Sequence, residues 1–172
     1  MTQLLGGGLT PRHQLAERQL LLAYLARQRQ LVCWKVDGLD DARARAVSTP
    51  TGLTVHVLVA HLTGVEHGWF VEHFAGAGEV RVRDEEFRAQ ERSLAELVDA
   101  YRAQVAASDA IIADADLDAV SARRDHTLRW IVLHLVEETS RHLGHLDLLT
   151  ELADGRLGEE PQGAPAPGAE EF

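Results

Sequence analysis

The segment that most constrains the fold is residues 128–153, because it is the longest stretch with helical periodicity and has a signal at both ends. Thr127 is a typical N-cap residue, and Gly155 stands where a C-terminal cap is expected. At about 100° of rotation per residue, the leucine, isoleucine and valine side chains form one apolar stripe. The segment is therefore predicted to be an amphipathic helix that packs its stripe against other helices.

Two polar residues, Glu138 and His142, fall within that apolar stripe rather than on the solvated face. Measured from Leu128, they lie at about 280° and about 320°, on either side of Ile131. A buried carboxylate must be neutralised by protonation, by a cationic partner or by a metal ion. The pair therefore predicts either a hydrogen bond within the core or two ligands of a metal site.

A third candidate ligand, His61, lies in residues 53–74, a second helical segment that Thr54 can cap. On a helical wheel, His61 falls among the apolar side chains of that segment. Gly64 and Gly68 flank it on the same face and leave space where a larger side chain would fill the core. His61 is therefore predicted to have room to meet a neighbouring side chain.

Two imidazoles and one carboxylate form a donor set that leaves coordination positions open, which favours a catalytic over a structural metal site. Zinc suits these ligands, and nickel, iron and manganese are the alternatives. The competing interpretation is a Glu138–His142 hydrogen bond in the core and an unrelated core histidine at position 61. His134 and His145 lie one turn from the pair, where they are candidates for proton transfer or substrate contact, or are boundary residues.

The other histidines show no such convergence on their helical faces. They are predicted to be surface residues: His13, His56, His67, His73 and His126. The tryptophans and Phe70 are expected to pack between helices, with Trp69 on the same inward side as His61. The sequence therefore predicts one cluster of chemically useful side chains rather than several.

The composition limits the class of protein. The chain has 172 residues with 45% hydrophobic content, enough for one domain with its own core. Its single cysteine, Cys33, excludes an internal disulfide and fits a reducing compartment. A formal net charge of −10 without a basic stripe argues against nucleic-acid binding, and no stretch is long and apolar enough for a membrane. We expect a cytoplasmic protein that binds neither nucleic acid nor a membrane.

Four segments carry helical periodicity, and no segment shows convincing strand alternation. A first helix is predicted to begin after Thr10, with Pro11 in its first turn, and to end by Gly38. Residues 40–46 are predicted to form a short helix. Residues 80–92 are polar and are predicted to be a loop.

Ser93 begins a capping-box pattern that opens a further helix. The four long helices predict an all-α, antiparallel four-helix bundle of residues 1–156. Residues 157–172 are rich in Glu, Gly, Pro and Ala and are predicted to be a disordered acidic tail. Bundles often hold metal sites between the inward faces of different helices, where the three candidate ligands would meet.

Two sequence motifs contain these candidates: HLTGVEHGWF at residues 61–70, and LRW at residues 128–130 followed by EE at 137–138 and RHLGHLD at 141–147. Together they resemble the DinB/YfiT-like metalloprotein superfamily, over about residues 15–155. The resemblance implies an up-down-down-up four-helix bundle that is often a homodimer. It also implies a metal held by one histidine of the second long helix and an i, i+4 pair of the fourth.

Carried over by motif, these ligands are His61, Glu138 and His142, the same three residues that the helical faces select. Many members have histidine at the position of Glu138. The glutamate version is similar to that of mycothiol-dependent maleylpyruvate isomerase, and related members transfer low-molecular-weight thiols. The resemblance implies a zinc-dependent enzyme with such a thiol as cosubstrate.

The isomerase has an additional C-terminal domain that contributes to its active site, whereas only an acidic tail follows this bundle. We therefore expect a thiol S-transferase or thiol-dependent isomerase acting on another small-molecule electrophile. Mycothiol is the first thiol expected, followed by bacillithiol and glutathione. The alternatives are a metal-dependent hydrolase, with His134 or His145 moving protons, and a non-enzymatic bundle that binds a metal or small molecule in a stress response.

Overall fold

The computed structural model describes residues 15–123 and 125–157, which are mainly helical and contain no β-strand. Within these ranges, extended pairing is limited to one bridge between Val120 and Thr127. The predicted all-α class is confirmed. The predicted helix start at Pro11, the predicted surface residue His13 and residues 158–172 of the predicted tail lie outside the described residues.

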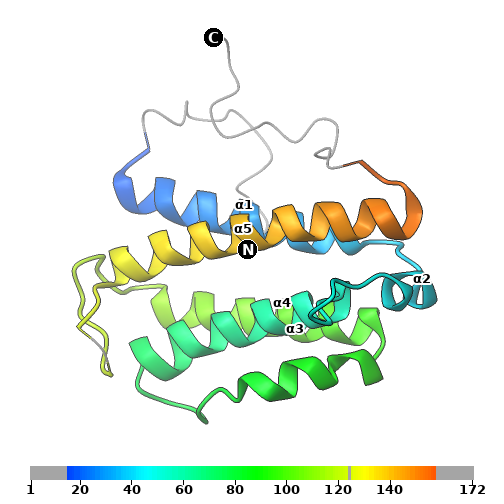
Figure 1. The fold of residues 1–172 in the computed structure, drawn as a ribbon. Helices are drawn as coiled ribbons and strands as arrows, with labels where there is room; N and C mark the ends of the chain where they lie inside the picture. The colour runs from blue at the N-terminus through cyan, green and yellow to red at the C-terminus, as the bar shows by residue number, and fades with distance from the viewer. Residues whose placement is uncertain (1–14, 124, 158–172) are drawn as a thin grey trace.

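The long helical elements form two layers (Figure 1). They are α1 (Glu17–Val36), α3 (Val55–Glu66), α4 (Leu94–Ile112) and α5 (Leu128–Asp154). In one layer α1 packs beside α5, and in the other α3 packs beside α4. The helices within a layer run in the same direction, and the two layers run in opposite directions (Figure 1). Helix α3 also contacts α5, so the two layers pack against each other.

The helix ends agree with the predicted caps. The side chains of Thr54, Ser93 and Thr127 each accept a hydrogen bond from the backbone N–H three residues further on. These bonds satisfy N–H groups that have no partner within the helix. Gly155 ends α5 with φ of 82°, a left-handed conformation that favours glycine. Local sequence signals therefore determine the start of α3 and both ends of α5, the two helices that carry the candidate ligands.

The apolar core has two parts, and α5 contributes to both. Ile131 and Leu135 are fully buried in one cluster, and Leu143 and Leu146 are buried in the other. Glu138 therefore lies on α5 between two well-packed regions. Burial of these side chains, worth roughly 1.5–3 kcal/mol for each large one, holds α5 against its neighbours.

A buried ion pair links α1, α3 and α4. The Arg29 guanidinium donates to both carboxylate oxygens of Glu66, at 2.7 and 2.6 Å, and to Asp109 Oδ1 at 2.7 Å. Arg29 and Glu66 are almost completely buried. Because both charges are almost completely buried, loss of one partner leaves the other without full compensation. The helical wheels gave no indication of this cluster.

The helix predicted for residues 53–74 is confirmed in extent but changes type along its length, and the predicted loop at residues 80–92 is a second difference. The helix that begins at Val55 continues beyond Glu66 as a π-helix, η2 (His67–Phe74), in which the backbone is wider than in an α-helix. The predicted loop at residues 80–92 is wrong for most of its length, because η3 (Arg83–Glu91) is a 3₁₀ helix. This polar segment packs against α3, and contacts of that kind leave no periodic signal in the sequence.

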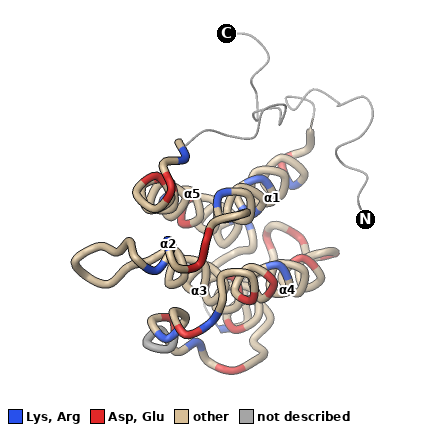
Figure 2. Tube along the Cα trace, turned by 90° about the vertical axis from the view of Figure 1, so that its right-hand side faces the viewer, with Lys and Arg blue, Asp and Glu red and all other residues tan. Residues whose placement is uncertain are grey.

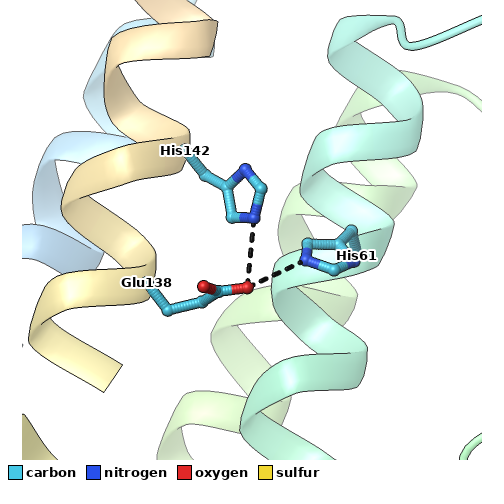
Figure 3. A group of neighbouring side chains, drawn as sticks. All are labelled: His61, Glu138 and His142. Atoms are coloured by element: carbon cyan, nitrogen blue, oxygen red, sulfur yellow. Dashed lines mark hydrogen bonds and ion pairs between the residues drawn. The ribbon is translucent and has the colours of Figure 1, made fainter. Parts of the chain in front are cut away.

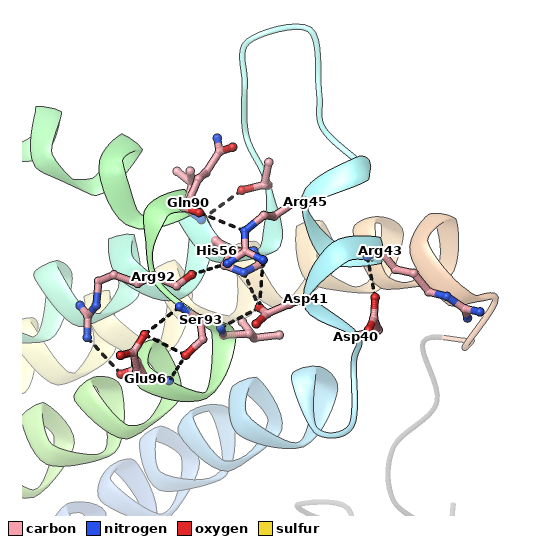
Figure 4. A network of polar contacts seen from close by, with 12 residues as sticks. Asp40, Asp41, Arg43, Arg45, His56, Gln90, Arg92, Ser93 and Glu96 are labelled. Atoms are coloured by element: carbon pink, nitrogen blue, oxygen red, sulfur yellow. Dashed lines mark hydrogen bonds and ion pairs between the residues drawn. The ribbon is translucent and has the colours of Figure 1, made fainter.

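The short helix α2 (Asp41–Ala46) confirms the predicted helix and covers one end of α3 (Figure 4). Asp41 Oδ1 accepts hydrogen bonds from His56 Nε2 and from the Leu94 backbone N–H, both at 2.8 Å. His56 is fully buried, so its predicted surface position is wrong. The reason is tertiary, because α2 covers a face of α3 that a helical wheel assigns to solvent. The Arg45 guanidinium extends this network to the Gln90 carbonyl.

Charged residues of both signs are spread over the helices, and the Lys and Arg residues form no continuous stripe along the described chain (Figure 2). None of the helices in the described ranges has the length and apolar character needed to cross a membrane.

Candidate metal centre

The three predicted ligands meet between α3 and α5 (Figure 3). His61 projects from α3, while Glu138 and His142 project from successive turns of α5. One ligand atom from each residue lies within 4.8 Å of the others, and no second group of this kind occurs among the residues that the structure describes. The helices therefore bring together the same three side chains that their predicted faces selected.

Glu138 stands between the two imidazoles. Its Oε1 lies 3.2 Å from His142 Nε2 and 3.5 Å from His61 Nε2. The two rings meet edge to face, with centroids 4.6 Å apart. The three side chains are 15–21% exposed. This partial burial lowers the dielectric around the group while leaving access for a small molecule.

His61 Nε2 provides an independent test of whether these residues suit a metal ion. This atom is buried and makes no hydrogen bond among the described residues, and its contact with Glu138 Oε1, drawn in Figure 3, is 3.5 Å long. A buried polar atom without a partner is costly, so such atoms need an explanation. A divalent cation accepts the lone pairs of two imidazoles and one carboxylate. The two imidazoles and the carboxylate, and the absence of a hydrogen bond to His61 Nε2 among the described residues, therefore fit a metal ion.

The protonation states also suit metal binding. Burial and the nearby His61 ring lower the pKa of His142 below its ordinary value, which outweighs the opposing effect of Glu138. Burial tends to raise the pKa of Glu138, but His142 and His61 together lower it. At neutral pH Glu138 is therefore ionised and His142 neutral. These are the forms in which carboxylates and imidazoles bind metals.

Of the two accessory candidates, only His145 contacts the group directly. Its Nδ1 lies 3.2 Å from His142 Nδ1, and its side chain is exposed. His134 instead packs against Trp69 and Trp130, with ring centroids 4.8 and 5.0 Å away. Their roles in proton transfer or substrate contact stay predictions.

His134 belongs to an aromatic cluster that sequence reasoning missed. Its members are Trp69, His73, His126, Trp130 and His134. His126 and Trp130 stack with centroids 3.9 Å apart. His67, His73 and His126 are half-buried, so their predicted surface positions hold only in part. The i, i+4 spacing of Trp69 with His73 and of Trp130 with His134 was the available signal.

Arg81 and Glu86 also contact the centre and were not predicted. Glu86 Oε2 lies 2.9 Å from His61 Nδ1, the ring nitrogen that faces away from Glu138. Burial tends to raise the pKa of Glu86, but hydrogen bonds from His61 and Arg81 hold it below its ordinary value. Glu86 comes from the segment predicted to be a loop, so no helical wheel could place it beside His61.

A hollow of about 490 Å³ lies elsewhere, at the end of the molecule where α1 and α5 begin and α4 ends. Glu17, Arg18, Arg129 and residues 113–118 line it. The Arg18 guanidinium donates to the carbonyls of Ile112 and Ala113 there, which satisfies the end of α4. None of the three candidate ligands lines this hollow, and we assign it a structural role.

The helical fold and the histidine–carboxylate group between its layers define a candidate metalloprotein of the α class. A family model for mycothiol S-transferase matches residues 20–155, and the chain belongs to this family. The match includes all three candidate ligands and confirms the DinB/YfiT-like resemblance. Searches of curated proteins and of solved structures gave no significant match.

Proposed function

We propose that this protein is a metal-dependent thiol S-transferase that joins a low-molecular-weight thiol of the mycothiol type to a small electrophile. The observation that carries the proposal is the convergence of His61, Glu138 and His142, with His61 Nε2 buried and making no hydrogen bond among the described residues. The family match supports a thiol as the cosubstrate. A thiol-dependent isomerase would use the same site and the same thiol.

The proposed architecture is an up-down-down-up four-helix bundle. It is supported by the common direction of α1 and α5 and the opposite direction of α3 and α4 (Figure 1). We further propose zinc as the metal, with nickel, iron or manganese as alternatives, and a cytoplasmic homodimer as the functional form.

The chain itself offers no activated thiol. Burial raises the pKa of Cys33, the only cysteine, so its thiol is a poor nucleophile at neutral pH. The nucleophile must come from the cosubstrate. A divalent ion held by His61, Glu138 and His142 would lower the pKa of the cosubstrate thiol, so that the thiolate is present at neutral pH.

The residues of the chain then have separate tasks. His61 and His142 present neutral nitrogens from two different helices, and Glu138 supplies a negative charge between them (Figure 3). The thiol proton is released when the thiolate forms, before the new carbon–sulfur bond is made, and it must leave the site. The exposed His145 ring, in contact with His142, is positioned to accept it and pass it to solvent.

The test begins with protein purified without added metal. About one divalent ion per chain is expected. After cobalt replaces this ion, the correct thiol should produce a sulfur-to-cobalt charge-transfer band and should accelerate conjugation of an electrophile. Both effects should be lost in His61→Ala. They should persist in His67→Ala, which removes a half-buried histidine whose Nε2–H donates to the Glu79 backbone carbonyl, outside the centre.

Two results would contradict the proposal. If esters or amides are hydrolysed while no thiol changes the cobalt spectrum, the hydrolase alternative replaces the transferase. If the protein binds metal but turns over neither class of substrate, the non-enzymatic alternative is correct.

A further inference from the structure

His61 Nδ1, the ring nitrogen that faces away from Glu138, has two competing neighbours. It lies 2.9 Å from Glu86 Oε2 and 3.0 Å from Arg81 Nη2. A carboxylate only accepts hydrogen bonds and a guanidinium only donates them. Nδ1 can therefore bond to Glu86 only when it carries a proton, and to Arg81 only when it does not. In a neutral ring, the choice decides which nitrogen keeps its lone pair.

The geometry of Arg81 favours the bond to Glu86. Both Arg81 Nε and Arg81 Nη2 lie 2.6 Å from Glu86 Oε1, so the guanidinium already donates to that carboxylate. Glu86 Oε2 remains free to accept from His61 Nδ1–H. The opposite tautomer would place the Nδ1 lone pair 2.9 Å from Glu86 Oε2, which is repulsive. The favoured tautomer places the Nε2 lone pair against Glu138 Oε1 at the longer distance of 3.5 Å, where the repulsion is weaker. Arg81 itself is held in place because its backbone N–H donates to Glu72 Oε2 at 3.0 Å.

Gly64, one turn after His61 on α3, provides the space for this pair. A Cβ atom at Gly64 would lie 2.7 Å from Arg81 Nε and 2.8 Å from Glu86 Oε1. A Cβ atom at Gly68 would meet only Arg81 Cδ, at an ordinary 3.6 Å. Glycine within a helix is less stable than alanine. At Gly64 the missing side chain therefore has a local use, which is to let the Arg81–Glu86 pair reach His61.

We propose that Glu86, held by Arg81, is a positioning residue that keeps His61 protonated at Nδ1, so that the Nε2 lone pair faces Glu138 and His142. The consequence for metal binding rests on the proposed function, whereas the tautomer is a property of the metal-free protein. Carboxylates that accept from the far nitrogen of a metal-binding histidine orient the ring and increase its basicity.

The decisive measurement is the tautomer of His61 in the metal-free protein. Long-range ¹H–¹⁵N spectra distinguish the two ring nitrogens, and an alkaline pH keeps the imidazole neutral. The parent protein should show Nδ1–H. In Glu86→Ala the acceptor is lost and Arg81 is free to donate, so the ring should change to Nε2–H. In Arg81→Met, which keeps the acceptor, Nδ1–H should remain.

Metal affinity provides the second measurement, with zinc as the probe. Glu86→Ala should weaken zinc binding by roughly 10–100-fold. Gly64→Ala should also weaken it, because the new methyl group displaces the Arg81–Glu86 pair, and the matched change Gly68→Ala should not. Gly64 lies in α3 and Gly68 in the continuing η2, and urea denaturation of both variants corrects for any difference in stability. A difference in zinc affinity that remains between them reports the Arg81–Glu86 pair.

The outcomes separate this proposal from the proposed function. If the parent protein binds no zinc, the metal site is wrong, and the tautomer measurement still decides the role of Glu86. If the parent protein shows Nε2–H, or if Glu86→Ala keeps both Nδ1–H and the parent affinity, the positioning role is overturned while the metal site stands. If Glu86→Ala fails to fold, the tautomer of the parent protein and the zinc affinities of the two glycine variants decide whether Glu86 positions His61.

Discussion

His56 and His61 lie on the same helix, α3, and each directs one ring nitrogen to a carboxylate. His56 Nε2 lies 2.8 Å from Asp41, and His61 Nδ1 lies 2.9 Å from Glu86. In each ring the other nitrogen is buried and has no hydrogen-bond partner among the described residues. The two histidines therefore share their local chemistry, and the difference between them lies in what the rest of the fold places opposite the second nitrogen.

Opposite His61, the fold places a carboxylate and a second imidazole from α5 (Figure 3). His56 instead lies in the corner formed by α2 and the start of α4 (Figure 4), where Asp41 also accepts from the Leu94 backbone. His56 is 0% exposed, whereas the His61 side chain is 19% exposed. A histidine–carboxylate pair thus packs into the core at one position and, in the proposed metal centre, orients a ligand at the other.

The largest expected effect is on metal binding. His61→Ala should weaken zinc binding by more than about 100-fold, because loss of a direct ligand exceeds the effect of losing its supporting carboxylate. His56→Ala should leave the affinity of the folded protein nearly unchanged. Competition with a chelator of known affinity measures both. Equal losses in the two variants would remove the distinction between the histidines.

Glu138→Gln sharpens the same comparison, because it keeps the size of the side chain and removes its charge. The variant should bind zinc more weakly than the parent, since an amide oxygen is a poorer ligand than a carboxylate. Isothermal titration with the metal-free protein measures the change. Unchanged affinity would mean that another carboxylate serves the metal.

The loss of folding stability should be larger for His56→Ala than for His61→Ala, the reverse of the order expected for metal binding. His56→Ala removes a fully buried side chain that donates to Asp41, and should lower the free energy of unfolding by about 2–3 kcal/mol. His61→Ala in the metal-free protein should cost less than about 1 kcal/mol, because its side chain is partly exposed whereas that of His56 is fully buried. Urea denaturation without metal tests this order, and a larger loss at His61 would contradict it.

The smallest expected effect is a pH dependence that originates at His56. Burial lowers the pKa of His56 below its ordinary value of 6.5, more than the bond to Asp41 raises it. The unfolded chain therefore binds a proton at a higher pH than the folded protein does. The stability from the neutral ring is fully present above pH 6.5 and is lost as the pH falls through the folded pKa.

The metal-free parent should thus become less stable below pH 6.5, and His56→Ala should reduce that slope. His142 has a lowered pKa as well, so part of the slope should persist in the variant. Thermal unfolding across this range measures both contributions. A slope that His56→Ala leaves unchanged would place the titrating group elsewhere.

Much of the candidate site could be predicted from helical faces. The apolar stripe of α5 placed Glu138 and His142 toward the core, and Gly64 of α3 and Gly68 of η2 left room beside His61. Thr54 and Thr127 cap the two helices as expected. These signals are local, because they depend on residues within a few turns of one another.

The same wheels misplaced His56 and did not find Glu86, and both failures have one cause. A helical wheel assigns a face to solvent unless the sequence shows what covers it. His56 is buried by α2 and the start of α4. Glu86, the partner of His61, comes from η3, a polar segment without periodicity. The aromatic cluster was missed for a related reason, because its rings come from η2, from α5 and from the connection before α5.

The sequence by itself therefore determined the helical class, the long helices and the three residues that can share a metal, because periodicity and caps act over short distances along the chain. Only the tertiary structure decided which polar groups meet. Glu86 lies 25 residues from His61, and Asp41 lies 15 residues from His56. Packing against η3 and α2 brings each carboxylate within hydrogen-bonding distance, and a buried polar group requires such a partner wherever in the chain it originates.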